Sequence, residues 1–326
     1  ETQLALGYYQ YYVLRDYRLA ETTFDSVIKT LPGSSEARRA LGLIARREGQ
    51  WDQSIGYFEQ ALALDPRNLE LFVPAALGYA LLRQFPAALK LYDRALDIMP
   101  DDPDVRASKA SIYQAQGNLQ QAATLLAEIP GQKPFEVIFA TKITQLRLER
   151  NYGEAIRLLQ ARLAQLHYDS QFDKGEDQVA LAFAQCLAGD TAGAKITAEL
   201  ARNTLEQLYR DQPDNVYIAE SLSRAYAAMG EKDSALKEAE RAVMLRPAVK
   251  EQLEGPDFEE NLALIQTIFG ENGQAISTIT RLLHTPYLSS LYGPAPITPA
   301  LLRLDPIWDP LRSDPAFQKL CEEKQP

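Results

Sequence analysis

The stretch ALGLIARREGQWDQSIGYFEQALALDP, residues 40–66, determines the fold of this chain. Apolar side chains recur at three- and four-residue spacing on both sides of residues 47–50, which predicts two amphipathic helices joined by a short turn. The small residues Gly42 and Ser54 let the two backbones approach closely, and Phe58 supplies the bulk that fills the space beside them. The stretch therefore predicts a helix pair.

The same pattern recurs with a period of 34 residues. In each repeat a small residue is followed four positions later by a bulky one, as in the pairs Ala20/Phe24, Ser54/Phe58, Ala88/Tyr92 and Ala122/Leu126. Prolines keep the same register at Pro32, Pro66 and Pro100. A single helix pair cannot bury its apolar face alone, so neighbouring pairs must stack into one continuous core.

This register resembles the motif of the tetratricopeptide repeat (TPR) family. The residues that carry the motif are Gly42, Ala45, Trp51, Ser54, Phe58, Ala61 and Pro66. The resemblance implies an all-α fold, a right-handed α-α superhelix (TPR solenoid) of about eight helix pairs with a concave groove. It also implies four regular units over residues 1–135 and four more divergent units over residues 136–288.

The later units keep the small residue but not the spacing. The series continues at Ala155, Ala194, Ala235 and Ala275. From Ala155 onward, each interval between these residues is wider than 34. We expect the extra length to lie between helices, and the second helix of the sixth unit to run on through Tyr209.

Residues 289–326 leave the register and contain six prolines between Pro294 and Pro315. We expect short helices at residues 299–303 and 315–323. Terminal repeats need a cover, and an exposed apolar patch invites aggregation, so we expect this Pro-rich segment to fold back as a C-terminal capping tail. A solvent-exposed docking arm is the alternative.

Both ends of the chain resemble the C-terminal repeat region of multidomain bacterial signalling proteins. In those proteins, similar repeats follow a kinase, a cyclase or a winged-helix regulator. The chain begins with Glu1 rather than Met, so we expect it to be a mature form or a piece of a longer polypeptide. The resemblance implies a regulatory module.

The composition excludes several classes of protein. Apolar residues make up 46% and charged residues 24%, which is typical of a soluble globular chain. The net charge is −10, with 17 basic and 26 acidic side chains in residues 151–326, so nucleic acid and anionic membrane are not expected partners of this segment. We expect a cytoplasmic location, with the periplasm as the alternative; the sequence does not determine an oligomeric state.

The chain offers little material for catalysis. It contains two histidines and two cysteines and none of the spacings typical of hydrolases, metalloproteases or nucleotide-binding loops. We expect Cys186 to be a buried, inert thiol. The sequence therefore predicts no enzyme activity, no cofactor and no metal.

The resemblance places partner binding in the groove, which in this family is lined by the first helix, helix A, of each unit. The expected partner is a protein or peptide. The residues that this register assigns to the groove are Tyr9, Tyr12, Arg39, Leu43, Arg46, Leu77, Ser111, Arg147, Phe183 and Arg224.

Two clusters near the N-terminus have alternative interpretations. Arg39, Arg46 and Arg47 form either a site for a carboxylate or phosphate, or surface pairs with Glu36 and Glu48. The tyrosines of residues 8–12 cover every face of the first helix, so some of them must lie outside the internal packing. They either seal the first unit, contact a preceding domain, or bind an aromatic partner.

Two functions of different class follow from these observations. The first is a non-enzymatic TPR scaffold that binds a protein or peptide in its concave groove. The second is a sensor whose groove closes on a small ligand and controls an attached effector.

Overall fold

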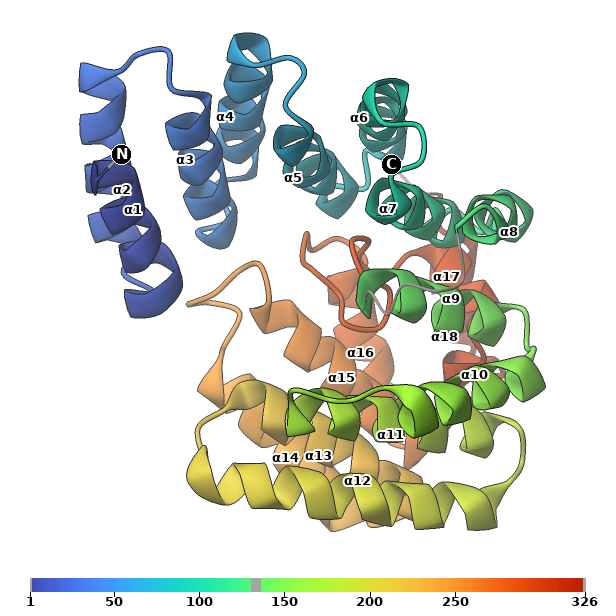
Figure 1. The fold of residues 1–326 in the computed structure, drawn as a ribbon. Coiled ribbons are helices and arrows are strands. Elements are labelled where there is room, and N and C mark those ends of the chain that lie inside the picture. The colour runs from blue at the N-terminus through green and yellow to red at the C-terminus, as the bar shows by residue number, and fades with distance from the viewer. Residues whose placement is uncertain (1, 130–135, 325–326) are drawn as a thin grey trace.

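The computed structural model describes residues 2–129 and 136–324, which form helices packed in consecutive pairs (Figure 1). The predicted all-α stack of eight helix pairs is confirmed. The pairs are α1 (Thr2–Tyr9, continued by the π-helix η1, Gln10–Leu14) with α2 (Tyr17–Thr30), α3 (Ser35–Arg47) with α4 (Trp51–Leu64), α5 (Leu69–Leu81) with α6 (Phe85–Ile98), α7 (Pro103–Ala115) with α8 (Leu119–Ala127), α9 (Glu136–Leu148) with α10 (Tyr152–Gln165), α11 (Gln171–Leu187) with α12 (Thr191–Asp211), α13 (Val216–Met229) with α14 (Lys232–Leu245), and α15 (Gly255–Ile268) with α16 (Asn272–Leu282).

The residues of the repeat register form the core. The small residues at the repeated position of helix B, the second helix of each pair, are at most 2% exposed; they are Ala20, Ser54, Ala88, Ala122, Ala155, Ala194, Ala235 and Ala275. A Cβ on Gly42 would lie 3.0 Å from the Phe58 ring, and the Ser54 hydroxyl donates to the Gly42 carbonyl at 2.7 Å. The close approach expected within the pair is therefore present, and a side chain at residue 42 would force the Phe58 ring to shift.

The turn between helix A and helix B repeats a left-handed backbone conformation. Glycine occupies this position in five units, at Gly49, Gly117, Gly189, Gly230 and Gly270. Arginine occupies it in the other three, at Arg15, Arg83 and Arg150, with φ between 52° and 58°. A non-glycine residue rarely adopts this conformation, so these three turns have a less favourable backbone than the glycine turns.

The sixth unit is longer than the regular ones. Helix α11 has 17 residues and α12 has 21, whereas α3 has 13 and α4 has 14. The extension of α12 past Tyr209 is as predicted. The expectation that the extra length lies between helices is wrong for this unit, because the residues extend the helices themselves. Gly175 allows α11 to approach α12, since a Cβ there would lie 2.8 Å from Leu205.

The C-terminal tail forms α17 (Pro299–Leu304), the 3-10 helix η2 (Pro306–Leu311) and α18 (Pro315–Glu322). Its apolar side chains are buried, with Trp308 and Phe317 at 0% exposure. Helix α18 contacts α16, and α17 contacts α7, so the tail lies between the last helix pair and the earlier units (Figure 1). The Thr298 hydroxyl donates to the Ala115 carbonyl at 2.7 Å, which joins the tail to the end of α7.

The stack curls until its two halves meet. The segment that joins α14 to α15, orange in Figure 1, returns to the lower ends of α1 and α3. Arg47, the last residue of α3, donates to Glu254 at 3.0 Å across 207 residues of sequence. The curl leaves a space on the inner side, where helices A of the later units face the tail.

Among the helices of the described residues, none is both long and apolar enough to cross a lipid bilayer.

Candidate functional site

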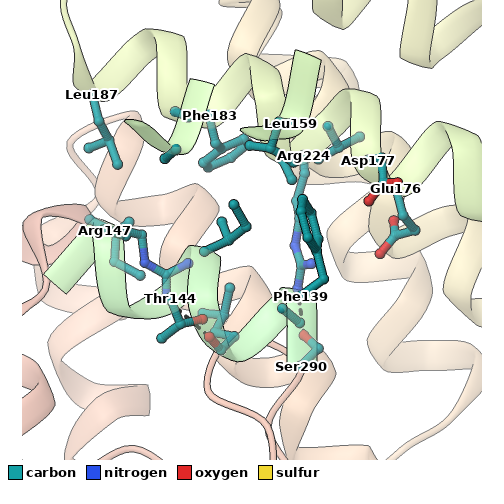
Figure 2. A pocket seen from close by; sticks show the side chains of 18 of the residues that line it. Phe139, Thr144, Arg147, Leu159, Glu176, Asp177, Phe183, Leu187, Arg224 and Ser290 are labelled. Carbon is teal, nitrogen blue, oxygen red and sulfur yellow. Dashed lines mark hydrogen bonds between the residues drawn. The ribbon is translucent and has the colours of Figure 1, made fainter. Parts of the chain in front are cut away.

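A cavity of about 360 Å³ lies on the inner side of the curl (Figure 2). Helices α9, α10 and α11 supply most of its wall, and α13, α15, the loop before α17 and η2 close it. Two of the units that were expected to be divergent repeats, α9 with α10 and α11 with α12, thus supply most of the lining. Ala140 at the rim is exposed, so the cavity is open to solvent.

Most of the wall is apolar. Aromatic rings come from Phe139 on α9 and from Phe172 and Phe183 on α11, and aliphatic side chains fill the space between them. Phe183 and Leu159 approach the cavity together, opposite Thr144 and Ser290 (Figure 2). A pocket with apolar walls and few polar groups is the usual form of a ligand or peptide site.

Arg147 enters the cavity from α9 and is held by the tail. Its guanidinium lies 3.0 Å from Asp305, whose side chain is fully buried, and donates to the Leu291 carbonyl at 3.0 Å. The same guanidinium lies 5.6 Å from the centre of the Tyr292 ring. Arg147 therefore joins helix A of the fifth unit to the tail at the cavity wall.

Arg224 enters from α13 on the other side (Figure 2). It donates to Asn261 at 2.8 Å, to Ser290 at 2.7 Å and to Glu220 at 2.5 Å. Burial opposes the charge on Arg224, yet the neighbouring carboxylates, Glu220 first, outweigh burial and raise its pKa. The charge of Arg224 is thus fixed by the acidic groups around it.

The carboxyl groups behind Arg224 lie in a nonpolar environment. Burial raises the pKa of Glu260 to about 7, against the opposing hydrogen bond that Ser289 donates at 2.6 Å. Burial and the nearby Glu220 also raise the pKa of Asp257, which accepts from the Ser290 amide at 2.7 Å. These acids hold residues 289–290 of the tail loop against the repeats.

Three further acidic residues of α11 line the cavity. Asp177 accepts from Arg162 and from Tyr168, each at 2.6 Å. Glu176 accepts from the Ser221 hydroxyl, and burial raises the pKa of Glu176. Asp173 lies one turn before Glu176 on the same helix, so the two carboxylates share one face of α11.

The cavity collects three of the residues predicted for the groove, Arg147, Phe183 and Arg224. The other seven lie outside its lining. Tyr9 and Tyr12 are 50% and 58% exposed at the first helix, and Leu43 and Ser111 are buried at 8% and 2%. Leu77 is half-buried on α5, whereas Arg39 and Arg46 take part in the packing of the first units.

The arginines of α3 have partners that neither sequence-based interpretation named. Arg39 donates to the Tyr8 hydroxyl at 3.1 Å, and Arg46, 5% exposed, donates to the Pro74 carbonyl at 3.0 Å. Arg47 does bind a carboxylate, but this carboxylate belongs to Glu254 of the same chain. The expected surface pairs with nearby glutamates do not describe these contacts, because Arg39 and Arg46 bond to the neighbouring units and Arg47 bonds across the curl.

Sequence reasoning missed several residues of the cavity. Ser290, Leu291 and Ile307 come from the tail, which has no repeat register, so no spacing pointed to them. Phe172 and Glu176 lie in the first half of the lengthened α11. The spacing of 39 residues between Ala155 and Ala194 was the available signal for that extension.

Cys186 differs from its prediction. It is exposed rather than buried, near the end of α11, and partial burial with the nearby Asp190 raises the pKa of its thiol. A raised pKa disfavours the thiolate, so this cysteine is a poor nucleophile. Among the described residues, no group of three or more histidine, cysteine, aspartate or glutamate side chains is placed to hold a metal ion.

Comparison with known proteins agrees with the repeat register. Residues 5–68 and 79–141 match family models of the tetratricopeptide repeat. A tetratricopeptide repeat protein from Parabacteroides merdae has a similar structure, with a TM-score of 0.56 and 16% identity over 81% of this chain and 98% of that protein. At that identity the likeness shows the fold.

Two further proteins are similar over smaller parts. Superkiller protein 3 of Schizosaccharomyces pombe is 25% identical over 123 residues, which are 38% of this chain and 8% of that protein. This chain thus spans less than a tenth of that curated relative. The structure of the APC/C hetero-tetramer Cut9-Hcn1 aligns with a TM-score of 0.49 and 13% identity, over 75% of this chain and 49% of that one.

Proposed function

We propose that this chain, which matches the tetratricopeptide repeat over residues 5–68 and 79–141, binds a segment of another protein in the cavity between α9, α11 and the tail. Repeats of this type are generally scaffolds for protein interaction. The observation that supports this site is the cavity itself, because apolar walls, charged groups and an open rim occur together on the inner side of the curl.

The size of the cavity fits part of a chain rather than a folded surface. A volume of about 360 Å³ accommodates one or two side chains, and the rest of a bound segment would lie along the rim. Arg147 and Arg224 are held in place by their hydrogen bonds, so the site is largely preformed. Preformed sites lose less entropy when a flexible segment binds.

A pocket-filling variant tests this proposal. Ala140→Trp places a large ring at the exposed rim of the cavity, and Ala192→Trp places the same ring at an exposed position of α12 outside the lining. Peptides are selected by display against the wild-type protein, and their affinities are measured by calorimetry. We expect Ala140→Trp to weaken binding about tenfold or more and Ala192→Trp to leave it unchanged.

A sensor of small ligands is the second candidate, and it is favoured by the volume of the cavity, about 360 Å³, which is within the range of small-molecule sites. Thermal melts with a metabolite library and with the selected peptides separate the two functions. Saturable shifts of the melting temperature with metabolites alone, and none with peptides, would contradict the scaffold.

We also propose that the segment regulates a larger bacterial signalling protein. The support for this part is the resemblance of both chain ends to the repeat regions of such proteins. Sequencing the complete open reading frame tests it directly, and a frame without an effector domain would contradict it.

A further inference from the structure

The charges of the cavity are unequally matched. Each lining arginine has a carboxylate of its own within 3.0 Å: Arg147 has Asp305, Arg162 has Asp177 and Arg224 has Glu220. Within the described residues, no basic side chain lies within ion-pair distance of Asp173 or Glu176. The cavity therefore has, on the face of α11, two acidic side chains without an ion-pair partner among the described residues.

The basic group behind this face is already engaged. Arg224 pairs with Glu220 and also lies near Asp257 and Glu260, so one guanidinium serves several carboxyl groups. The half of the chain that contains the cavity, residues 151–326, also holds 26 acidic and 17 basic side chains. A positively charged partner is attracted to such a region and a negatively charged one is repelled.

The apolar wall next to these carboxylates suits a cation on an apolar stem. Phe139 and Phe172 line the cavity together with Glu176, and Arg162 already lies over the Phe139 ring at 4.5 Å. Aromatic faces attract cations, and lysine and arginine bury their methylene groups on apolar surface while the charged end meets a polar group.

From these observations, and resting on the function proposed above, we propose that the bound segment inserts a lysine or arginine side chain into the cavity. Its methylene groups pack against the phenylalanine wall, and its charged end meets Glu176 and Asp173. The cation neutralises two carboxylates that the protein itself leaves without a basic partner.

The state of Glu176 agrees with this role. Burial raises the pKa of Glu176, so its ionised form is costly while the cavity holds only solvent. An incoming cation offsets this cost and favours the carboxylate. The Ser221 hydroxyl already holds the side chain, which limits the reorganisation on binding.

The test replaces charge on both sides of the contact. In each selected peptide the basic residue is exchanged for norleucine, which keeps the stem and removes the charge. We expect wild-type protein to bind the norleucine peptide about tenfold or more weakly, and Glu176→Gln to bind both peptides equally weakly. Glu240→Gln, the same change at an exposed position of α14, serves as the matched control. Asp173→Asn replaces Glu176→Gln if circular dichroism shows that the latter is unfolded.

The outcomes separate this inference from the proposed function. A peptide that binds Ala140→Trp weakly but tolerates norleucine would contradict the proposed insertion of a basic side chain. It would leave the proposal of a peptide-binding scaffold standing. Peptides insensitive to Ala140→Trp would contradict the site itself.

Phenethylamine and 2-phenylethanol probe the cavity without any peptide. By nuclear magnetic resonance titration we expect the amine to bind wild type more tightly than Glu176→Gln, and the alcohol to bind the two alike. Equal binding of amine and alcohol by wild type would overturn the cation preference. Tight amine binding in a protein that selects no peptide would assign the site to a free amine instead.

Discussion

Three arginines occupy a backbone position that favours glycine. A non-glycine residue in the left-handed region costs roughly 1 kcal/mol. Two of the three use the position to hold the tail: Arg83 donates to the carbonyls of Leu282, Thr285 and Ile297, and Arg150 pairs with Asp309 at 2.7 Å. At Arg83 the unfavourable conformation is offset by hydrogen bonds to buried carbonyl groups, whereas at Arg150 the side chain forms a partly exposed ion pair.

Arg83 permits a test that separates strain from bonding. Arg83→Ala removes the hydrogen bonds and keeps the strained backbone, so we expect the free energy of unfolding to fall by about 2–4 kcal/mol. Arg83→Gly removes the same bonds but relieves the strain, so its loss should be about 1 kcal/mol smaller. Urea denaturation measures both. Arg15→Gly is the control, because Arg15 has the same backbone conformation with an exposed side chain, and it should not destabilise the protein. Wild-type stability in Arg83→Ala would show that the carbonyl contacts contribute nothing.

Glu260 makes stability depend on pH. Its pKa is about 7 in the folded protein and ordinarily 4.5, so between these values the folded state binds more protons than the unfolded state. Stability is therefore greatest below pH 4.5 for this group and falls as the pH rises through 7. Glu260→Gln cannot ionise and keeps an acceptor for Ser289. We expect it to be more stable than wild type by roughly 1–3 kcal/mol at pH 8, with the gain shrinking toward pH 5.

Thermal melts from pH 5 to pH 8 measure this difference. Glu240→Gln, exposed on α14, is the matched control and should follow the wild-type profile. A gain that does not vary with pH would mean that packing, rather than ionisation of Glu260, separates the two proteins.

Among the helices, the sequence predicted a boundary well wherever neighbouring side chains fix the position at which the helix begins. The tail helices α17 and α18 were expected at 299–303 and 315–323 and occur within one residue of those bounds, because a side-chain acceptor followed by proline starts each of them. The π-helix η1 and the 3-10 helix η2 were not predicted. The same local signal is nevertheless present at η2, where Asp305 precedes Pro306 and accepts from the Ile307 amide at 3.1 Å.

The candidate site was predictable only in part for a related reason. The repeat register identifies one face of helix A, and three of the residues that it assigned to the groove, Arg147, Phe183 and Arg224, line the cavity. It contains no information on how tightly the stack curls. Curling buries Leu43 and Ser111 among neighbouring helices and brings the tail into the space that an open groove would leave.

At the scale of the whole molecule, the contact between α3 and the segment before α15 closes the curl. Arg47 donates to Tyr11 at 3.1 Å and to Glu254 at 3.0 Å, and Glu254 also accepts from Tyr217 and Arg246. Glu254 thus joins the second and seventh units, and Arg47 joins both to the first through Tyr11. Burial disfavours its charge, but Arg47, Tyr217 and Arg246 outweigh burial and lower its pKa.

We expect Arg47→Met to loosen this closure while each helix pair stays folded, because neighbouring units carry most of the stability of a repeat stack. Hydrogen exchange followed by mass spectrometry should show faster exchange in residues 248–254 and little change in α5–α8. Arg38→Met is the control, since Arg38 bonds within the first two units, to Pro32 and Gln60. Because the cavity lies on the inner side of the curl, a looser closure should also weaken binding of the selected peptides. Unchanged exchange at residues 248–254 in Arg47→Met would mean that the two halves are held by the tail alone.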